Sequence, residues 1–148
     1  MVSAMTSDDV LELSIVRATL EGLAARLAAR RGQQQCAREF AELIPQIKRA
    51  GEERDLAALS RLNSQFHLVV RDAAGNRYLD RILAQLQNVV RRFPDPTLEL
   101  PGRIEESVNE HVELAEAISA GNAEEAARLA SEHQKHLSEL RLRMLLNV

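Results

Sequence analysis

The apolar pattern constrains the fold of this chain most, because hydrophobic residues recur at steps of three and four along almost the whole sequence. That spacing lines up residues on one face of an α-helix, whereas a half-buried strand needs strict alternation, which no stretch shows. We therefore predict an all-α fold. With 148 residues, the chain has the length of a single domain with one core.

Capping and turn residues divide the pattern into about six helices. Ser7 or Asp8 is expected to cap the first helix and Gly32 to end it, while Pro45 must kink or split the second. Asp55 and Asn76 are expected to cap the third and fourth helices. The expected ranges are 8–31, 34–50, 56–75, 77–93, 103–120 and 123–146, with one clear loop at 94–102. Because the connections are short, the helices should pack mostly antiparallel, as a bundle.

Two of these helices have stripes that predict which side chains face the core. The expected stripe of the first helix is Leu13, Val16, Leu20, Leu23 and Leu27. The expected stripe of the fourth is Leu79, Ile82, Leu86, Val89 or Val90, and Phe93. Surplus apolar positions on the same two helices would support a homodimer.

Composition excludes several classes of function. The net charge is −3 and aromatic residues make up 3% with no Trp, so the chain lacks both the basic surface and the stacking platforms of nucleic-acid-binding domains. No apolar run approaches the roughly 20 residues that span a bilayer. The first residues lack the pattern of a secretion signal, and we expect a cytoplasmic protein with no membrane partner. The single cysteine, Cys36, has no nearby metal-binding partner in the sequence.

Three of the four histidines occupy positions that helical periodicity turns inward. His111 lies in the middle of the stripe of the fifth helix, and His133 lies in the middle of the stripe of the sixth. Asn63 and His67 are four residues apart on the third helix, on a face that borders its apolar stripe. An inward imidazole costs desolvation unless its nitrogens find partners. Three such imidazoles on three different helices suggest that they share one partner.

A divalent metal ion is such a partner, because neutral imidazole is a good ligand for transition metals and Asn63 offers a carbonyl oxygen. The alternative is that each histidine is a separate core residue bonded to a nearby polar group. Two known metal schemes are excluded: no Glu-x-x-His pair and no HExxH motif includes any of the four histidines.

The segments IVRATLEGLAARLAA, LNSQFHLVVRDAAGNRYL and EHVELAEAISAGNAEEAARLASEH resemble the FCD domain. This is the all-helical effector domain of FadR-type regulators in the GntR family of bacterial transcription factors, and the resemblance covers nearly all of residues 10–140. Metal-binding members use an Asp and a His four residues apart, then two His residues 22 apart. By that resemblance Asn63, His67, His111 and His133 take the metal positions, with Zn, Ni or Mn as the ion. His136 falls outside the pattern.

Asn63 departs from the family, which has Asp at this position. A neutral amide is a weaker ligand than a carboxylate, so we expect a lower metal affinity or none. Four neutral ligands would also leave the charge of a divalent ion uncompensated and strengthen its attraction for an anionic effector.

Arg17 matches the Arg of the family's R-x-x-x-E pattern and has two interpretations. It is either a surface ion pair with Glu21, four residues on, or a clamp for a carboxylate effector. Arg71, Arg91 and Arg92 are expected on solvated faces of their helices.

The leading interpretation is an effector-binding and dimerisation domain that senses a small carboxylate at a metal-containing pocket and is not an enzyme. Residues 8–148 would form this domain and residues 1–7 a tail or linker remnant. The family's winged-helix domain, which would contact DNA, is not readable in this chain. One alternative is a small hydrolase with a three-histidine metal, although Glu110 and Glu132 are expected to point away from the ion. The other is a metal-free dimerisation bundle.

Overall fold

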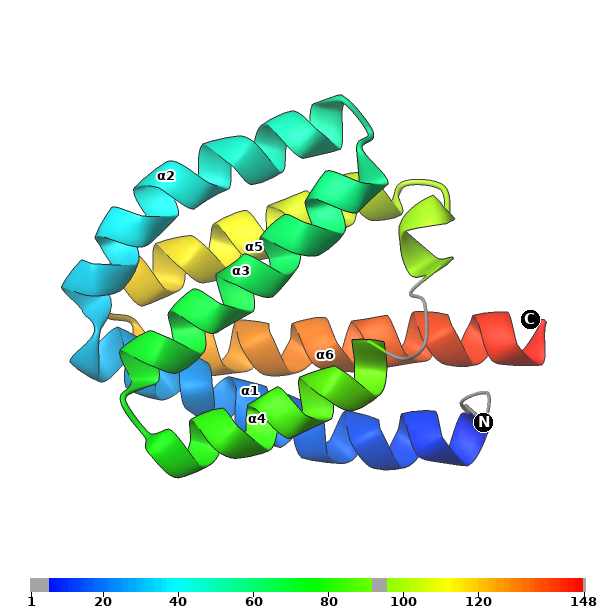
Figure 1. Cartoon of the computed structure of the whole chain (residues 1–148), viewed down its shortest axis with the longest axis horizontal. Helices are drawn as coiled ribbons and strands as arrows, with labels where there is room; N and C mark the ends of the chain where they lie inside the picture. The colour runs from blue at the N-terminus through cyan, green and yellow to red at the C-terminus, as the bar shows by residue number, and fades with distance from the viewer. Residues whose placement is uncertain (1–5, 92–95, 148) are drawn as a thin grey trace.

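The computed structural model describes residues 6–91 and 96–147, with the side chains of residues 90 and 91 left out, and this part of the chain contains helices and no strand (Figure 1). The all-α prediction is confirmed. The elements are α1 Ser7–Arg31, α2 Gln33–Glu52, α3 Leu56–Ala74, α4 Arg77–Arg91, a short 3-10 helix η1 Pro96–Glu99, α5 Arg103–Ser119 and α6 Ala123–Leu146.

The helix ends follow local capping chemistry, with one correction. The cap of α1 is Thr6 rather than Ser7 or Asp8, because its hydroxyl accepts the Asp9 N–H at 3.1 Å while the Asp9 carboxylate accepts the Thr6 N–H at 2.9 Å. Asp55 caps α3, which ends at Gly75 in the left-handed conformation with φ 65°. These ends, and the Asn76 cap of α4, match the prediction.

Pro45 does not split the second helix. α2 is one helix from Gln33 to Glu52 and passes through this residue. Pro45 lies on the exposed face, as does Ala41, whose carbonyl loses its helical partner there. Water can satisfy that carbonyl, so the helix continues at a tolerable cost.

The buried face of α1 differs from the prediction. α1 packs against α6 through small residues, and a side chain at Gly22 would meet the Ala127 carbonyl oxygen at 3.2 Å. The predicted leucine stripe is only half-buried, and Val16 is 44% exposed. The fully buried apolar residues of α1 beyond its first turn are Ala18, Ala24, Ala25, Ala28 and Ala29. The close approach of the α1 and α6 backbones determines which residues of α1 are buried. The hydrophobicity of the side chains alone does not predict this.

The stripe of α4 and the loop after it also need correction. Leu79 and Leu83 are buried, whereas the predicted Ile82 is 45% exposed. The side chain of Val90 and all of Phe93 lie outside the described residues. The expected loop at 94–102 contains η1, which buries Thr97 and Leu98 and so closes one end of the bundle.

The aromatic part of the core lies where α2, α3 and α5 meet. The rings of Phe40 and Phe66 stack with centroids 4.6 Å apart, and the Phe66 ring also meets His111 edge-on at 4.8 Å. The core therefore forms one wall beside the histidines.

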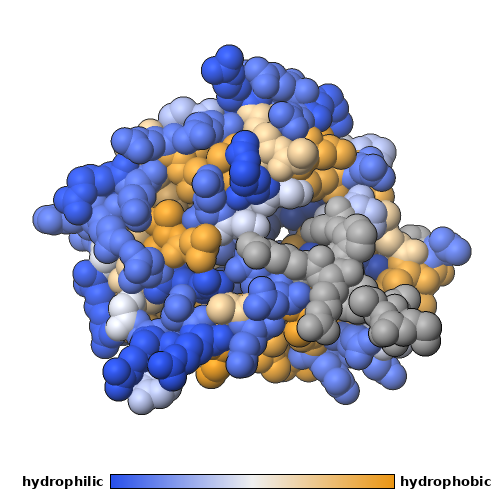
Figure 2. Space-filling view, in the orientation of Figure 1, coloured by the Kyte–Doolittle hydropathy of each residue, from blue (hydrophilic) through white to orange (hydrophobic). Residues whose placement is uncertain are grey.

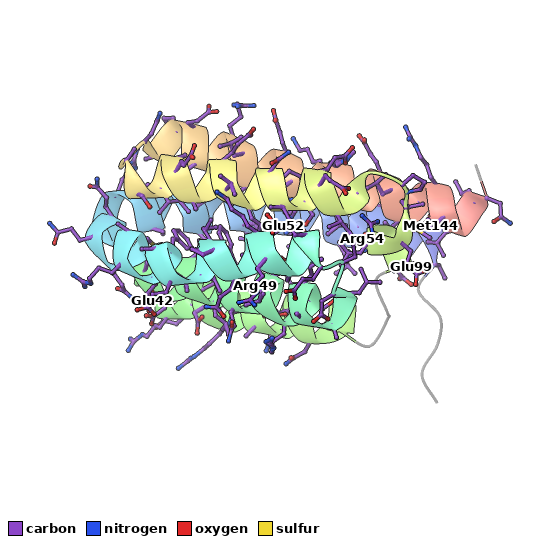
Figure 3. All side chains as sticks on the ribbon, turned by 90° about the horizontal axis from the view of Figure 1, so that it is seen from above. Glu42, Arg49, Glu52, Arg54, Glu99 and Met144 are labelled. Carbon is purple, nitrogen blue, oxygen red and sulfur yellow. The ribbon has the colours of Figure 1, made fainter. Side chains whose placement is uncertain are left out.

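The outer surface is largely charged. Hydrophilic residues dominate the face in Figure 2, with apolar patches between them, and exposed residues such as Glu42, Arg49 and Glu52 cover α2 (Figure 3). None of the described helices has the length and apolar character needed to cross a membrane.

Candidate metal centre

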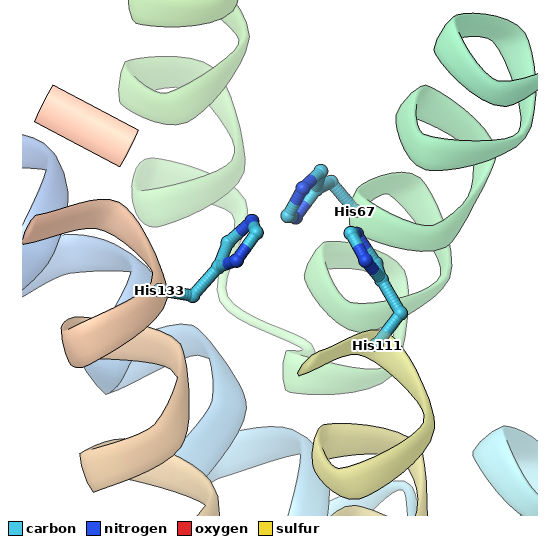
Figure 4. Close-up of side chains that lie close together, drawn as sticks. All are labelled: His67, His111 and His133. Atoms are coloured by element: carbon cyan, nitrogen blue, oxygen red, sulfur yellow. The ribbon is translucent and has the colours of Figure 1, made fainter. Parts of the chain in front are cut away.

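Three imidazoles from three helices meet inside the bundle (Figure 4). His67 comes from α3, His111 from α5 and His133 from α6, and each offers a nitrogen that lies within 4.8 Å of those of the other two. The ring centroids are 5.0 to 6.1 Å apart. The structure thus brings together the three histidines that the helical stripes turned inward.

His111 presents one nitrogen to the space between the rings. Its Nδ1 lies 2.6 Å from the Ser107 carbonyl oxygen, to which it donates, and its buried Nε2 has no hydrogen-bond partner in the part of the chain that the structure describes. Burial, together with the nearby His133, lowers the pKa of His111 to about 3. The ring is therefore neutral at physiological pH, with an unused lone pair on Nε2.

A carboxylate on the neighbouring helix supports His133. Its Nδ1 lies 2.5 Å from Oε2 of Glu110 on α5. Burial alone would raise the pKa of Glu110, but hydrogen bonds from His133 and Arg103 hold it at about 2. Although Glu110 is adjacent to His111 in the sequence, its side chain reaches across to α6 and contacts Nδ1 of His133, a contact that the sequence did not predict.

The third histidine and Asn63 share one face of α3. Burial and the other two imidazoles hold the pKa of His67 well below its usual range, so this ring is also neutral. One turn before it, the side-chain oxygen of Asn63 is buried and has no hydrogen-bond partner within residues 6–91 and 96–147. A buried amide oxygen without a donor is costly, and a cation would satisfy it.

Arg17 and Glu21 form an ion pair, as one of the two interpretations of Arg17 has it, but the pair is buried and not on the surface. Arg17 is 9% exposed and Glu21 is 6% exposed, with 3.7 Å between Nη2 and Oε1. Oε2 of Glu21 lies 3.8 Å from Nδ1 of His67. Burial raises the pKa of Glu21, although the Arg17 guanidinium opposes that shift. Glu21, His67 and His133 line a small cavity of about 10 Å³, close to the space that one water occupies.

The other basic residues that the sequence analysis considered are Arg71, Arg91, Arg92 and His136. Arg71 is buried rather than solvated, and it ties α3 to α4 by donating to Asp80 at 3.1 Å and to Gln87 at 2.9 Å. The side chain of Arg91 and all of Arg92 lie outside the described residues. His136 is partly exposed, and its Nε2 lies 3.0 Å from the Glu106 carboxylate.

The sequence reasoning missed Glu21 as a neighbour of the histidines and Glu110 as the partner of His133. Glu21 had a usable signal, since it follows Arg17 by one helical turn on the face now seen to be buried. The orientation of Glu110 depends on how α5 crosses α6, and no spacing within one helix encodes that crossing.

The donor set suits a divalent transition metal. It combines three imidazoles that lie together with the amide oxygen of Asn63, which comes one helical turn before His67 on α3. Two of its atoms, Nε2 of His111 and Oδ1 of Asn63, are buried without a hydrogen-bond partner among the described residues. Nitrogen-rich sites of this kind favour zinc, nickel and similar ions over calcium or magnesium.

The sequence model of the FCD domain matches residues 12–136. This agrees with the resemblance over residues 10–140 predicted from the motifs. A comparison with curated proteins found no match.

Proposed function

The chain belongs to the FCD domain family, whose members are effector-binding regulatory domains of GntR-family regulators, and we propose that it senses a small organic acid at a bound divalent metal ion. The observation that carries this proposal is the convergence of three imidazoles, one of which, His111, has a buried Nε2 without a hydrogen-bond partner among the described residues. In a metal-free core, burial of His111 Nε2 and of the Asn63 oxygen would cost free energy that no hydrogen bond offsets.

In this proposal His67, His111, His133 and Asn63 hold the ion, with Zn, Ni or Mn as the candidates. When bound, the ion supplies a concentrated positive charge that attracts the carboxylate of an effector. All four ligands are neutral, so none of them offsets this charge directly. A ligand set of this kind favours an anionic effector over a neutral one.

Arg17 is the proposed second contact for the acid. Its guanidinium belongs to the buried Arg17–Glu21 pair, and Glu21 in turn lines the cavity beside His67 and His133. A planar guanidinium can hold a carboxylate through two hydrogen bonds. An acid with two polar ends would bridge the metal and Arg17, and its entry requires the cavity of about 10 Å³ to widen.

We further propose that the domain forms a homodimer through α1 and α4. The domain includes Thr6 and Ser7, which cap and begin α1, and so does not start at the expected residue 8. These two helices contact each other and expose large apolar side chains: Leu11, Ile15, Val16, Tyr78, Ile82 and Val89. We also propose a cytoplasmic location, and contact with DNA only through a winged-helix domain of the kind that the family's regulators have.

The test is metal-dependent binding of carboxylates. Chelator-treated domain should take up about one divalent ion per chain and gain thermal stability from it, and His111→Ala or His133→Ala should remove that gain. Metal-loaded domain should then bind small di- and tricarboxylates but not their amides, and Arg17→Ala should weaken this binding. Unchanged metal uptake in both histidine variants would refute the site, and binding of neutral compounds alone would refute the organic-acid proposal.

A further inference from the structure

A chain of polar contacts runs outward from the three histidines along α5. Oε2 of Glu110 lies 2.5 Å from Nδ1 of His133, and Oε1 of the same carboxylate accepts a hydrogen bond from Nη1 of Arg103 at 2.8 Å. Arg103 is only 3% exposed and also donates to Glu106 at 3.3 Å. The guanidinium thus fixes the Glu110 carboxylate, since the same Nη1 also donates to Oε2 at 3.3 Å.

The neighbouring group of Glu106, Glu110 and His136 could suggest a second cation site, since one ligand atom from each lies within 4.8 Å of the others. It already contains a cation, however, because the Arg103 guanidinium bonds both carboxylates. Being buried, this guanidinium cannot swing away into solvent. The group is therefore better understood as a support for Glu110 than as a place for another ion.

We propose that Glu110, held by Arg103, is a positioning residue that fixes His133 in the tautomer with the proton on Nδ1 and so keeps Nε2 free to bind the metal. Only a group that accepts hydrogen bonds can have this effect, and an ionised carboxylate accepts and never donates. Metal-binding histidines are commonly oriented in this way by an outer carboxylate or carbonyl. His111 has the equivalent support from the Ser107 carbonyl. The inference rests on the proposed metal site.

Glu110→Gln tests this because the amide keeps the size of the carboxylate but adds a donor. Arg103 can only donate, so it retains the amide oxygen, and the amide NH₂ then faces Nδ1 of His133. That contact favours the tautomer with the proton on Nε2, which blocks the metal-binding lone pair. We expect the affinity for Zn²⁺ to fall about 10–100-fold, measured by competition with a chelator of known affinity.

Glu132→Gln is the matched control, since Glu132 is also adjacent to a histidine in the sequence but is exposed and pairs with Arg128. It should bind Zn²⁺ as tightly as the wild type. If Glu110→Gln binds Zn²⁺ as the wild type does, the proposal is overturned. A second equivalent of Zn²⁺ bound through Glu106 and Glu110 would also overturn it, because Glu110 would then be a ligand.

The tautomer itself provides a readout that a general loss of stability would not produce. Long-range proton–nitrogen NMR spectra of the metal-free wild type at pH 8 should show His133 with its proton on Nδ1, and Glu110→Gln should move it to Nε2. A wild-type His133 with its proton on Nε2 overturns the inference even if the variant fails to fold. A wild type that binds no Zn²⁺, Ni²⁺ or Mn²⁺ would instead refute the proposed function, and this inference with it.

Discussion

Replacing His111 by Leu should change the stability of the domain in opposite directions with and without metal. In the metal-free state, Nε2 of His111 is buried without a partner, which costs about 1–3 kcal/mol. Leu removes that cost and places an apolar side chain of similar size against the Phe66 ring, which meets His111 at 4.8 Å. The metal-free variant should therefore be as stable as the wild type or more so.

The magnitude follows from two opposing contributions. Leu also loses the hydrogen bond from the His111 ring to the Ser107 carbonyl, which is worth about 0.5–1.5 kcal/mol. That carbonyl still has its backbone hydrogen bond within α5, so it is not left without a donor. The net expectation is a gain of about 1 kcal/mol in the free energy of unfolding without metal. At a free metal concentration of 100 times Kd, the wild type gains about 2.7 kcal/mol and the variant gains nothing, so the order of stability reverses.

Urea unfolding with chelator and with excess Zn²⁺ measures both states. His136→Leu serves as the control, because this histidine is partly exposed and its contact is with Glu106. It should keep the full metal-dependent gain. If His111→Leu loses about 2 kcal/mol without metal and still gains stability from Zn²⁺, His111 is a packed core residue and not a ligand.

Three further predictions follow from individual residues. Asn63→Asp should raise metal affinity and leave the affinity for anionic effectors unchanged or lower, because it adds a harder, charged oxygen beside the ion; weaker metal binding in a titration would show that Asn63 is not a ligand. Gly32→Ala should destabilise the domain by about 1–3 kcal/mol in urea unfolding, because the new Cβ would lie 2.6 Å from Cβ of Ala73; unchanged stability would contradict the packing of this junction. In the metal-free domain, the pKa of His111 is about 3 in the folded state and 6.5 in the unfolded chain. As the pH falls, the unfolded chain therefore takes up a proton at this residue before the folded domain does. This group should therefore cost about 2 kcal/mol of stability between pH 7 and pH 5, and equal pH slopes for the wild type and His111→Leu would contradict the shift.

The inward histidines were predictable because one helix encodes their direction. His111 and His133 interrupt otherwise apolar stripes at the right step, so their burial follows from helical geometry. Helix ends were predictable for a similar reason, since Asp55, Gly75 and Asn76 act through contacts within a few residues. Caps and side-chain directions of this kind do not depend on how the helices pack against one another.

The features that the sequence did not predict depend on how helices meet. Ala and Gly carry little hydrophobic signal, yet they form the buried face of α1 because they let α6 approach closely. The Glu110–His133 contact joins two helices, and the burial of Arg17 and Glu21 depends on the same α1 face. Such contacts are fixed by tertiary packing, which no spacing in one helix contains.

The most direct test of the metal centre is the X-ray absorption spectrum of the domain loaded with one equivalent of Zn²⁺. The spectrum reports the kind and number of ligands around the ion without any substitution. Convergence of His67, His111 and His133 predicts a shell of nitrogen and oxygen atoms with the multiple scattering of three imidazoles. A shell with one imidazole or none, or one that contains sulfur from Cys36, would contradict the account.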